Sequence, residues 1–311
     1  MGINYWPQSG EPIKSLCVYT TIYPGVEAYL RDWFQSIQKQ TDQDYQLWIG
    51  LDAVSVEEAI GAMGGEPKAT WVMANTGDTP AQVRQRALEQ IVEICDGVVL
   101  VDSDDILHAS RVAAAREALQ LSDLAGCALR LVDQQGRDLN ITFSIPPGLS
   151  PESVFPRNNI FGLSNSAFRT EFLRRCLPIP AAAVPVDWFL GTRAWLYGAR
   201  LTFDRRIQMD YRQHGKNMTQ VRPPFSEEQI SRDTERVLQH FQIVRNSSIL
   251  GAMAGRVQEL VDVAADVELF YRKVVLQPNR FDSYVEAFNA LEPAPLWWSS
   301  VAHPSLRNIW A

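Results

Sequence analysis

The order of apolar runs in the first half of the chain is the strongest constraint on its fold. Short β-rich runs alternate there with amphipathic helical patterns, which is typical of a βαβ chain with a mostly parallel sheet. The predicted strands span residues 16–22, 45–51, 70–74 and 98–101. Between them, apolar residues recur at helical spacing from Val26 to Ile37, and Thr79, Pro80 and Gln82 carry the start signature of another helix. The pattern predicts an α/β fold.

The sequence pattern changes past about residue 220. An Arg-Pro-Pro run at residues 222–224 breaks the pattern, and Ser226 with Gln229 opens a helical pattern of mixed charge that continues to about residue 275. A shorter helix is expected near residues 282–291. We therefore expect two domains, a catalytic one over residues 1–220 and a helical C-terminal extension over residues 221–311.

Packing against the catalytic domain is the simplest role for this extension. A homodimer interface, an acceptor-binding flap and a patch resting on a membrane are the alternatives. Trp297, Trp298 and Arg307 suit the membrane patch only weakly, because aromatic residues at helical spacing usually belong to a core.

Composition excludes several classes of function. The 311 residues include 29 Lys and Arg against 36 Asp and Glu, a net charge of −7, so the chain lacks the positive charge that a general nucleic-acid binder needs. No apolar run approaches the ~18–20 residues of a membrane helix. The first residues, MGINYWPQSGEPIK, do not show the basic patch and apolar stretch of a secretory signal. These features predict a cytoplasmic protein, with peripheral contact at the inner face of the membrane as the alternative.

The four cysteines lie far apart, and none of them forms a CxxC pair with another. We expect all four to be buried as small hydrophobic residues in a reducing compartment, with neither a disulfide framework nor a structural zinc ion. They are Cys17, Cys95, Cys127 and Cys176.

The most informative residues for chemistry are Val101-Asp102-Ser103-Asp104-Asp105. Three carboxylates follow a buried strand at the sheet edge where parallel sheets bind ligands. Like charges at close range repel, and a divalent cation relieves that repulsion; Mg²⁺ and Mn²⁺ both prefer carboxylate oxygen and leave positions open for phosphates. The alternative is a solvated acidic turn in which Asp105 caps the next helix. The motif alone does not decide between the two.

Motifs of several other enzyme classes are absent from the sequence. There is no GxxxxGK[ST] loop, no GxGxxG after the first strand, no HExxH and no GxSxG. The glycine-rich run at residues 61–65 has no lysine and is interpreted as a flexible turn. His108, His240 and His303 lack partners at metal-ligand spacing.

Further segments follow one another in a set order along the chain. They are Thr20-Thr21-Ile22-Tyr23-Pro24 at the end of the first strand, residues 36–41 (SIQKQT), Asp52 after the second strand, an arginine-bearing helix, the VDSDD run, residues 161–169 (FGLSNSAFR), Val186-Asp187-Trp188 with Arg193, and residues 211–217 (YRQHGKN). In order and spacing they resemble the inverting GT-A glycosyltransferases of family 2. The resemblance covers roughly residues 14–220 and departs from the family where Val186 replaces a usual Glu.

This resemblance implies a GT-A fold, Rossmann-like with a mostly parallel central sheet flanked by helices, and a binding site for a nucleotide-sugar donor. Asp52 would accept hydrogen bonds from uracil and ribose, although a plain turn aspartate remains the alternative. Asp102 would hold the ribose or the water shell of a metal ion. Either Arg84 or Arg86 would face the nucleotide, and the spacing does not choose between them. The other donor-contacting residues implied are Thr20, Thr21, Tyr23, Ser103, Gly162, Asn165 and Arg212.

The resemblance also implies the catalytic and metal-binding residues. Asp104, with Asp102, would ligate Mn²⁺ or Mg²⁺, which would neutralise the diphosphate leaving group and supply the positive charge that an acidic protein lacks. His214 would be a further metal or phosphate ligand, or else a structural histidine. Asp187 would be the general base that takes the proton of the acceptor hydroxyl. The same Asp187 could serve as the N-cap of a helix over residues 188–197.

The expected function is therefore an inverting, metal-dependent glycosyltransferase. It would move a sugar from a nucleotide sugar, most simply a UDP-sugar, to a saccharide or lipid-linked saccharide acceptor in surface polysaccharide biosynthesis. A sugar nucleotidyltransferase, which also places carboxylates around a metal, is the first alternative. A catalytically silent relative that binds nucleotide or glycan is the second.

Overall fold

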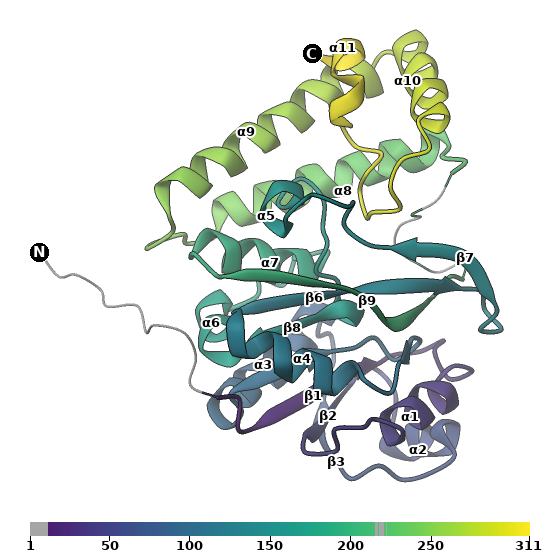
Figure 1. Ribbon diagram of the computed structural model, residues 1–311, viewed down its shortest axis with the longest axis vertical. Helices are drawn as coiled ribbons and strands as arrows, with labels where there is room; N and C mark the ends of the chain where they lie inside the picture. The colour runs from purple at the N-terminus through teal and green to yellow at the C-terminus, as the bar shows by residue number, and fades with distance from the viewer. Residues whose placement is uncertain (1–11, 215–216, 218–220, 222) are drawn as a thin grey trace, which may run out of the picture.

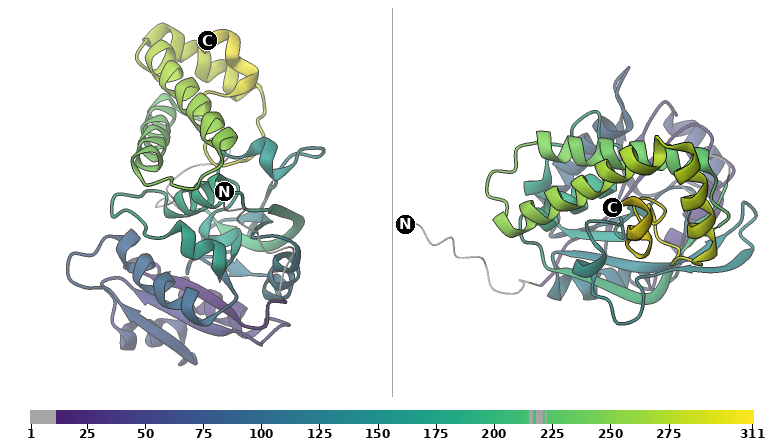
Figure 2. Two further views of the ribbon diagram at one scale, coloured as in Figure 1. Left: turned by 90° about the vertical axis from the view of Figure 1, so that its left-hand side faces the viewer. Right: turned by 90° about the horizontal axis from the view of Figure 1, so that it is seen from above.

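The computed structural model describes residues 12–214, 217, 221 and 223–311. The beginning of the chain and the predicted domain boundary near residue 220 lie outside these residues. In the described part, one sheet of nine strands carries helices along its length, with the first strands towards one end of the molecule and the C-terminal helices at the other (Figure 1). Figure 2 shows the same arrangement from the side and from above.

The first half of the sheet is parallel, in the order β3-β2-β1-β4. Its strands are β1 (Leu16–Ile22), β2 (Gln46–Leu51), β3 (Ala69–Met73) and β4 (Gly97–Leu100). The helices between them are α1 (Leu30–Gln38), α2 (Val56–Met63) and α3 (Pro80–Ile94). All seven residues of β1 are buried, as expected for a strand covered on both faces. The four predicted strands are confirmed to within one residue at each end.

The start of α3 follows the predicted capping chemistry. The Thr79 side chain accepts a hydrogen bond from the Gln82 amide, the Gln82 side-chain oxygen accepts one from the Thr79 amide, and Pro80 occupies the first turn. This box satisfies backbone N–H groups that a helix start leaves unpaired.

The second half of the sheet mixes directions, in the order β4-β8-β6-β9-β5, with β7 paired to β6. β8 runs antiparallel to both of its neighbours, whereas β9 runs parallel to β6. The strands are β5 (Ile106–Leu107), β6 (Leu124–Val132), β7 (Asp138–Phe143), β8 (Ser166–Arg169) and β9 (Leu201–Arg212). The helices are α4 (Arg111–Leu121), α5 (Pro151–Val154), a 3₁₀ turn at Leu163–Asn165, α6 (Thr170–Cys176) and α7 (Val186–Leu196).

The C-terminal part is helical, and it packs against α7. Its helices are α8 (Glu227–Asn246), α9 (Ala254–Phe270), which continues into a π-helical turn at Tyr271–Val275, α10 (Pro278–Ala290), a 3₁₀ turn at Pro304–Leu306 and α11 (Arg307–Trp310). Ser226 caps α8 through the Gln229 amide, as predicted. His240 of α8 stacks on Trp188 of α7 with ring centroids 4.1 Å apart, and Trp298 stacks on the same indole at 5.8 Å. Every helix in the described residues is too short or too polar to span a bilayer.

Two local predictions were wrong. The glycine-rich run at residues 61–65 is not a turn throughout, because α2 continues to Met63 and ends at Gly64, whose φ of 75° suits glycine. Ser55 and Glu58 form a capping box at the start of this helix. The Ser-x-x-Glu spacing of these two residues is a capping-box signature that predicts a helix start from the sequence.

The second correction concerns the cysteines. Cys17 and Cys95 form a disulfide, while Cys127 and Cys176 are buried and free. The two bonded residues are 78 positions apart, so no short-range spacing predicts the pair. They meet because Cys17 lies in β1 and Cys95 lies two residues before β4, and these strands are neighbours in the sheet.

Candidate active site

A cavity of about 450 Å³ opens where β1, β2 and β4 end. The carboxyl edge of a parallel sheet is where ligands bind in α/β folds. Nine of the residues predicted to contact the donor, bind the metal or act as the base line this cavity, and they come from segments between residues 21 and 214. They are Thr21, Tyr23, Asp52, Arg84, Asp102, Asp104, Gly162, Asp187 and His214.

Three carboxylates gather after β4. Oxygens of Asp102, Asp104 and Asp105 all lie within 4.8 Å of one another. Burial, reinforced by the neighbouring Asp104 charge, raises the pKa of Asp102 to about 7, and the same two causes raise the pKa of Asp105 well above its usual range. A cluster of this kind, made only of hard oxygen donors, fits Mg²⁺ or Mn²⁺, whose charge would offset the repulsion.

The three carboxylates do not face the same way. Asp102 and Asp104 line the cavity, whereas Asp105 is turned into the protein. One Asp105 oxygen accepts a 2.7 Å hydrogen bond from the Arg212 amide, and the other accepts one from the Ser164 hydroxyl. Asp105 therefore does not cap the following helix, which begins after Ser110. Asp102 and Asp104 remain as the pair open to a ligand.

Asp104 has two side-chain partners at the cavity wall. His214 Nε2 lies 2.9 Å from Asp104 Oδ2, and the Tyr23 hydroxyl donates to the same oxygen at 3.4 Å. The His214 ring stacks on Tyr29 with centroids 5.4 Å apart, which fixes the ring plane. The structure thus brings the two predicted metal-binding types, carboxylate and imidazole, to one point.

The structure also separates the two candidate arginines. Arg84 lines the cavity, and its Nη2 lies 4.0 Å from Asp102 Oδ1. Arg86 instead donates to Asp78 at 2.7 Å and to the Met73 carbonyl at 2.9 Å. The helix α3 therefore presents Arg84 to the cavity and holds Arg86 against its own N-terminal loop.

Asp187 lines the cavity at the start of α7. It is not the N-cap, as one prediction had it: Pro185 takes that place, and Asp187 is the second residue of the helix. One carboxylate oxygen accepts a 2.8 Å bond from the Trp188 amide, and the other accepts a 3.1 Å bond from Asn159 Nδ2. Burial raises the pKa of Asp187, so its proton affinity exceeds that of an ordinary aspartate.

Five predicted donor-contacting residues do not line the cavity. Thr20 is fully buried, and the Ser103 hydroxyl donates to the Thr21 carbonyl at 2.8 Å. Asn165 Nδ2 donates to the carbonyls of Cys127 and Ile160, at 2.8 and 3.1 Å. Arg212 Nε donates to the Asp104 carbonyl at 2.9 Å, and Arg86 is held as described above. Donor contacts by these residues stay predictions; Ser103 and Arg212 bond to the backbone of residues that do line the cavity.

The connection at residues 158–165 holds functional side chains that the sequence did not single out. Asn159 orients Asp187, and Ser164 bonds to both Asp102 and Asp105, with its Oγ also accepting from the Asp102 amide at 3.2 Å. One short segment therefore bonds both to the carboxylate cluster and to Asp187. In the sequence, the FGLSNS stretch predicted donor contacts by Gly162 and Asn165, but not by Ser164 or the preceding Asn159.

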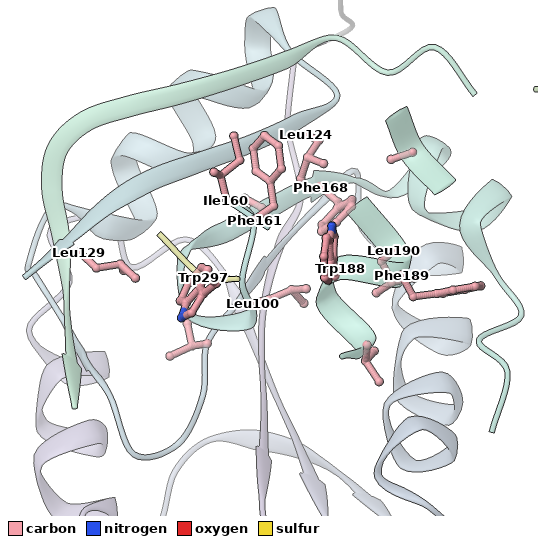
Figure 3. Close-up of a cluster of buried hydrophobic side chains, with 14 of the residues drawn as sticks. Leu100, Leu124, Leu129, Ile160, Phe161, Phe168, Trp188, Phe189, Leu190 and Trp297 are labelled. Carbon is pink, nitrogen blue, oxygen red and sulfur yellow. The ribbon is translucent and has the colours of Figure 1, made fainter. Parts of the chain in front are cut away.

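The C-terminal segment completes the cavity wall. Trp297 and Trp298 line it, and the Trp297 indole packs so closely on Gly162 that a Cβ there would lie 2.5 Å from a ring carbon. Asn158 Nδ2 donates to the Trp297 carbonyl at 3.3 Å. Trp297 and Trp188 belong to a buried cluster with Phe161 and Leu100 (Figure 3). Gly162 thus has a packing role, whatever its contact with a donor.

No protein-family model matches the sequence, and no curated protein matches it either. Solved structures do match. The structure of S. aureus TarS 1–349 in complex with UDP-GlcNAc has 14% identity and a TM-score of 0.53, covering 94% of this chain and 92% of that one. A second structure of S. aureus TarS 1–349 has 14% identity and a TM-score of 0.52, covering 94% and 91%. These likenesses, which concern the fold alone, confirm that the chain has the α/β fold of GT-A type that the sequence predicted.

Proposed function

We propose that this protein is an inverting, metal-dependent glycosyltransferase of the family 2 kind, which takes its sugar from a UDP-sugar. One observation carries the proposal: a single cavity joins the Asp102–Asp104 pair, suited to a metal and a diphosphate, with the oriented carboxylate of Asp187. The complex of TarS with UDP-GlcNAc lends support, since a protein of this fold holds a nucleotide sugar.

Asp102 and Asp104 would hold a Mn²⁺ or Mg²⁺ ion, with His214 beside them as a further ligand for the ion or the diphosphate. When bound, such an ion supplies positive charge against the departing diphosphate. Arg84 adds a fixed positive charge on the same side of the cavity. Cationic groups at this point compensate for the acidic character of the whole chain.

The nucleotide would occupy the side of the cavity formed by the ends of β1 and β2. Asp52 follows β2 and would accept hydrogen bonds from uracil and ribose, while Thr21 and Tyr23 would line the pocket of the base. This arrangement directs the sugar end of the donor away from the sheet edge and towards Asp187.

Asp187 would act as the general base. Its carboxylate takes the proton of the acceptor hydroxyl while that oxygen forms a bond to the anomeric carbon. The bond from the anomeric carbon to the diphosphate oxygen breaks, and the nucleoside diphosphate leaves with the electron pair. Because attack and departure take place on opposite faces, the configuration inverts. The bonds from Asn159 and the Trp188 amide hold the carboxylate in one orientation for this transfer.

The acceptor would be a saccharide or a lipid-linked saccharide, and the setting would be surface polysaccharide synthesis at the cytoplasmic side of a membrane. A peripheral membrane contact and a homodimer through the C-terminal helices belong to the same proposal. The division of the chain near residue 220 into a catalytic domain and a helical extension does too.

A thermal-shift screen of nucleotides and nucleotide sugars, with and without Mn²⁺, tests the donor and the metal together. A ligand at 100 times its Kd stabilises the folded state by about 2.7 kcal/mol. We expect stabilisation by UDP and UDP-sugars only when Mn²⁺ is present, and loss of that response in Asp104→Asn. The matched control is Asp262→Asn, which changes an exposed carboxylate of α9 and should respond like the wild type. An equal response in Asp104→Asn would remove Asp104 as the metal ligand.

A further inference from the structure

The 158–165 connection is tied at its start to the C-terminal part of the chain. It leads from α5 to a 3₁₀ turn, so strand pairing does not fix its first residues. Arg157, directly before it, donates from Nη2 to Asp266 of α9 at 2.6 Å. The next side chain, Asn158, donates to the Trp297 carbonyl at 3.3 Å. Two successive side chains therefore bond this part of the chain to the segment after residue 220.

The ion pair between Arg157 and Asp266 is part of a small clamp. Its side chains are only 21% and 16% exposed, and Arg157 Nη1 also donates to the Ala302 carbonyl at 3.2 Å. Arg307, at the start of α11, donates to the other oxygen of Asp266 at 3.2 Å. A planar guanidinium that bonds to two partners at once fixes direction as well as distance. The clamp therefore constrains where Arg157 lies.

The residue after Asn158 orients the proposed base. Asn159 is 2% exposed, its Nδ2 donates to Asp187 at 3.1 Å, and its Oδ1 accepts from the Phe161 amide at 3.1 Å. Because both ends of this side-chain amide are bonded, it cannot rotate without losing one of the two bonds. Its donation to Asp187 therefore depends on the position of the Asn159 backbone, two residues from Arg157.

We infer that Arg157 is a positioning residue, which α9 holds in place so that Asn159 stays against Asp187. Arg157 does not line the cavity, and it acts through the side chain two positions further along. This gives the helical C-terminal part a role in the transfer step itself, in addition to packing. The inference rests on the proposed glycosyl transfer, in which Asp187 is the base, and it adds the contact that keeps this base in its orientation.

The position of the 158–165 connection also affects the proton affinity of Asp187. Burial raises the pKa of Asp187, whereas the hydrogen bonds from the Asn159 side chain and the Leu163 backbone, both in this connection, lower it. If the connection shifts, these bonds weaken and the pKa rises further. The acid limb of the transfer rate then moves to higher pH, because the base must be deprotonated. Two further charged groups act on Asp187, and the variants below leave both unchanged: Arg84 and Asp102.

The test measures kcat against pH for two variants that open the clamp from opposite sides, Arg157→Gln and Asp266→Asn. Release of UDP is followed with the UDP-sugar and Mn²⁺ that most stabilise the wild type in the thermal-shift screen, and water serves as the acceptor. We expect each variant to lower kcat about tenfold through misplacement of the base. Each should also raise the pH midpoint of the acid limb by about half a unit, through a weakened bond to the carboxylate.

The two variants separate positioning from a change of charge. Arg157→Gln removes a positive charge and Asp266→Asn removes a negative one, so a purely electrostatic effect on Asp187 would move the midpoint in opposite directions. Such a result would overturn the inference. Asn159→Ala removes the bond to Asp187 directly and sets the upper limit of the shift.

Arg116→Gln is the matched control. Arg116 and Asp42 form an ion pair at 2.7 Å with exposures of 19% and 17%, and Arg116 Nη1 donates to the Ile13 carbonyl at 3.1 Å. This pair does not line the cavity. We expect Arg116→Gln to lose as much thermal stability as Arg157→Gln while keeping the wild-type kcat and pH midpoint. If Arg157→Gln and Asp266→Asn also lost only stability, the clamp would merely hold the fold together and the inference would be wrong.

A second measurement tests the same inference without transfer. Asp187→Asn does not titrate, so the difference in unfolding free energy between a protein and its Asp187→Asn form reports the pKa of Asp187 in the folded state. Because this pKa is raised, the carboxyl group adds stability as the pH falls through it. In the Arg157→Gln background this gain should begin at higher pH than in the wild type, and an unchanged onset would overturn the inference. A shifted onset without UDP release by the wild type would overturn the proposed function and leave the placement of Asp187 by Arg157 in force.

Discussion

Two sets of residues line the cavity, and the chain delivers them differently. The polar set lies at strand ends of one parallel sheet, so Thr21, Asp52 and Asp102 reach the cavity through the regular geometry of neighbouring strands. The apolar set comes from loops and the C-terminal segment, and its members, from Leu163 to Trp298, are up to 135 positions apart. The comparison teaches that a repeated fold element delivers the carboxylates of the cavity, while irregular segments deliver its apolar lining.

Asp187→Asn separates the proposed base from the polar set of strand-end residues most sharply. The amide keeps the size of the side chain but cannot take a proton, so we expect the transfer rate to fall by about 10²–10⁴-fold. Binding of UDP with Mn²⁺, which we propose for the polar set, should stay at the wild-type level. Steady-state transfer assays and the thermal-shift response measure the two effects side by side.

The pH profile of the wild type adds a second measure of the same residue. Because a base must be deprotonated and burial raises the pKa of Asp187, transfer should decline on acidification at a pH above that of an ordinary aspartate. An Asp187→Asn enzyme that transfers sugar at near wild-type speed would exclude Asp187 as the base.

Gly162→Ala tests how tightly the C-terminal segment is fitted to the cavity. The new Cβ would lie 2.5 Å from the Trp297 ring, so either the indole or the 158–165 connection must shift. Overpacking of this kind destabilises a fold by about 1–3 kcal/mol. Denaturant unfolding should show the loss, together with a higher KM for the acceptor.

Gly61→Ala is the matched control for this substitution. Gly61 lies in α2 with no atom within 4 Å of an added Cβ, so alanine should be neutral or stabilise the protein by up to about 1 kcal/mol. If Gly162→Ala were as stable as Gly61→Ala, with an unchanged acceptor KM, the Trp297 contact would have no part in shaping the cavity.

The polar set was largely predictable from the sequence because its signals are local. A buried strand followed by Asp102-Ser103-Asp104-Asp105 predicts a carboxylate cluster at a sheet edge, and the structure contains it. Thr79 and Gln82 predict a helix start because both partners of the capping box lie within one turn. The choice between Arg84 and Arg86 was not local, since it depends on how α3 is rotated against the sheet.

The rest of the cavity wall was not predictable, because it depends on contacts between positions far apart in the sequence. Nothing near Gly162 in the sequence indicates that Trp297 packs on it, and nothing near Asn159 indicates that it holds Asp187. The Cys17–Cys95 bond escaped prediction for the same reason. Contacts over 28 or more positions follow from the complete fold, whereas caps and strand ends follow from a few neighbouring residues.

The smallest expected effect concerns the contact of α8 with Trp188, on which Trp298 of the apolar set stacks. His240 is buried between Trp188 and Thr192, with its Nε2 3.2 Å from the Thr192 hydroxyl, and burial lowers the pKa of His240 to about 3. The unfolded chain takes up a proton near pH 6.5, but the folded chain does not until about pH 3, so stability falls as the pH falls between these values. At pH 5 the loss from this residue is at most about 2 kcal/mol, and at pH 7 it is close to zero.

His240→Phe cannot be protonated and keeps an aromatic ring on Trp188, so its free energy of unfolding should decline less between pH 7 and pH 5 than that of the wild type. Denaturant unfolding of both proteins across this pH range measures the difference in stability, in which the contributions of other titrating groups cancel. Parallel curves would mean that His240 is accessible to protons in the folded state. The contact between α7 and α8 would then be looser than the structure shows.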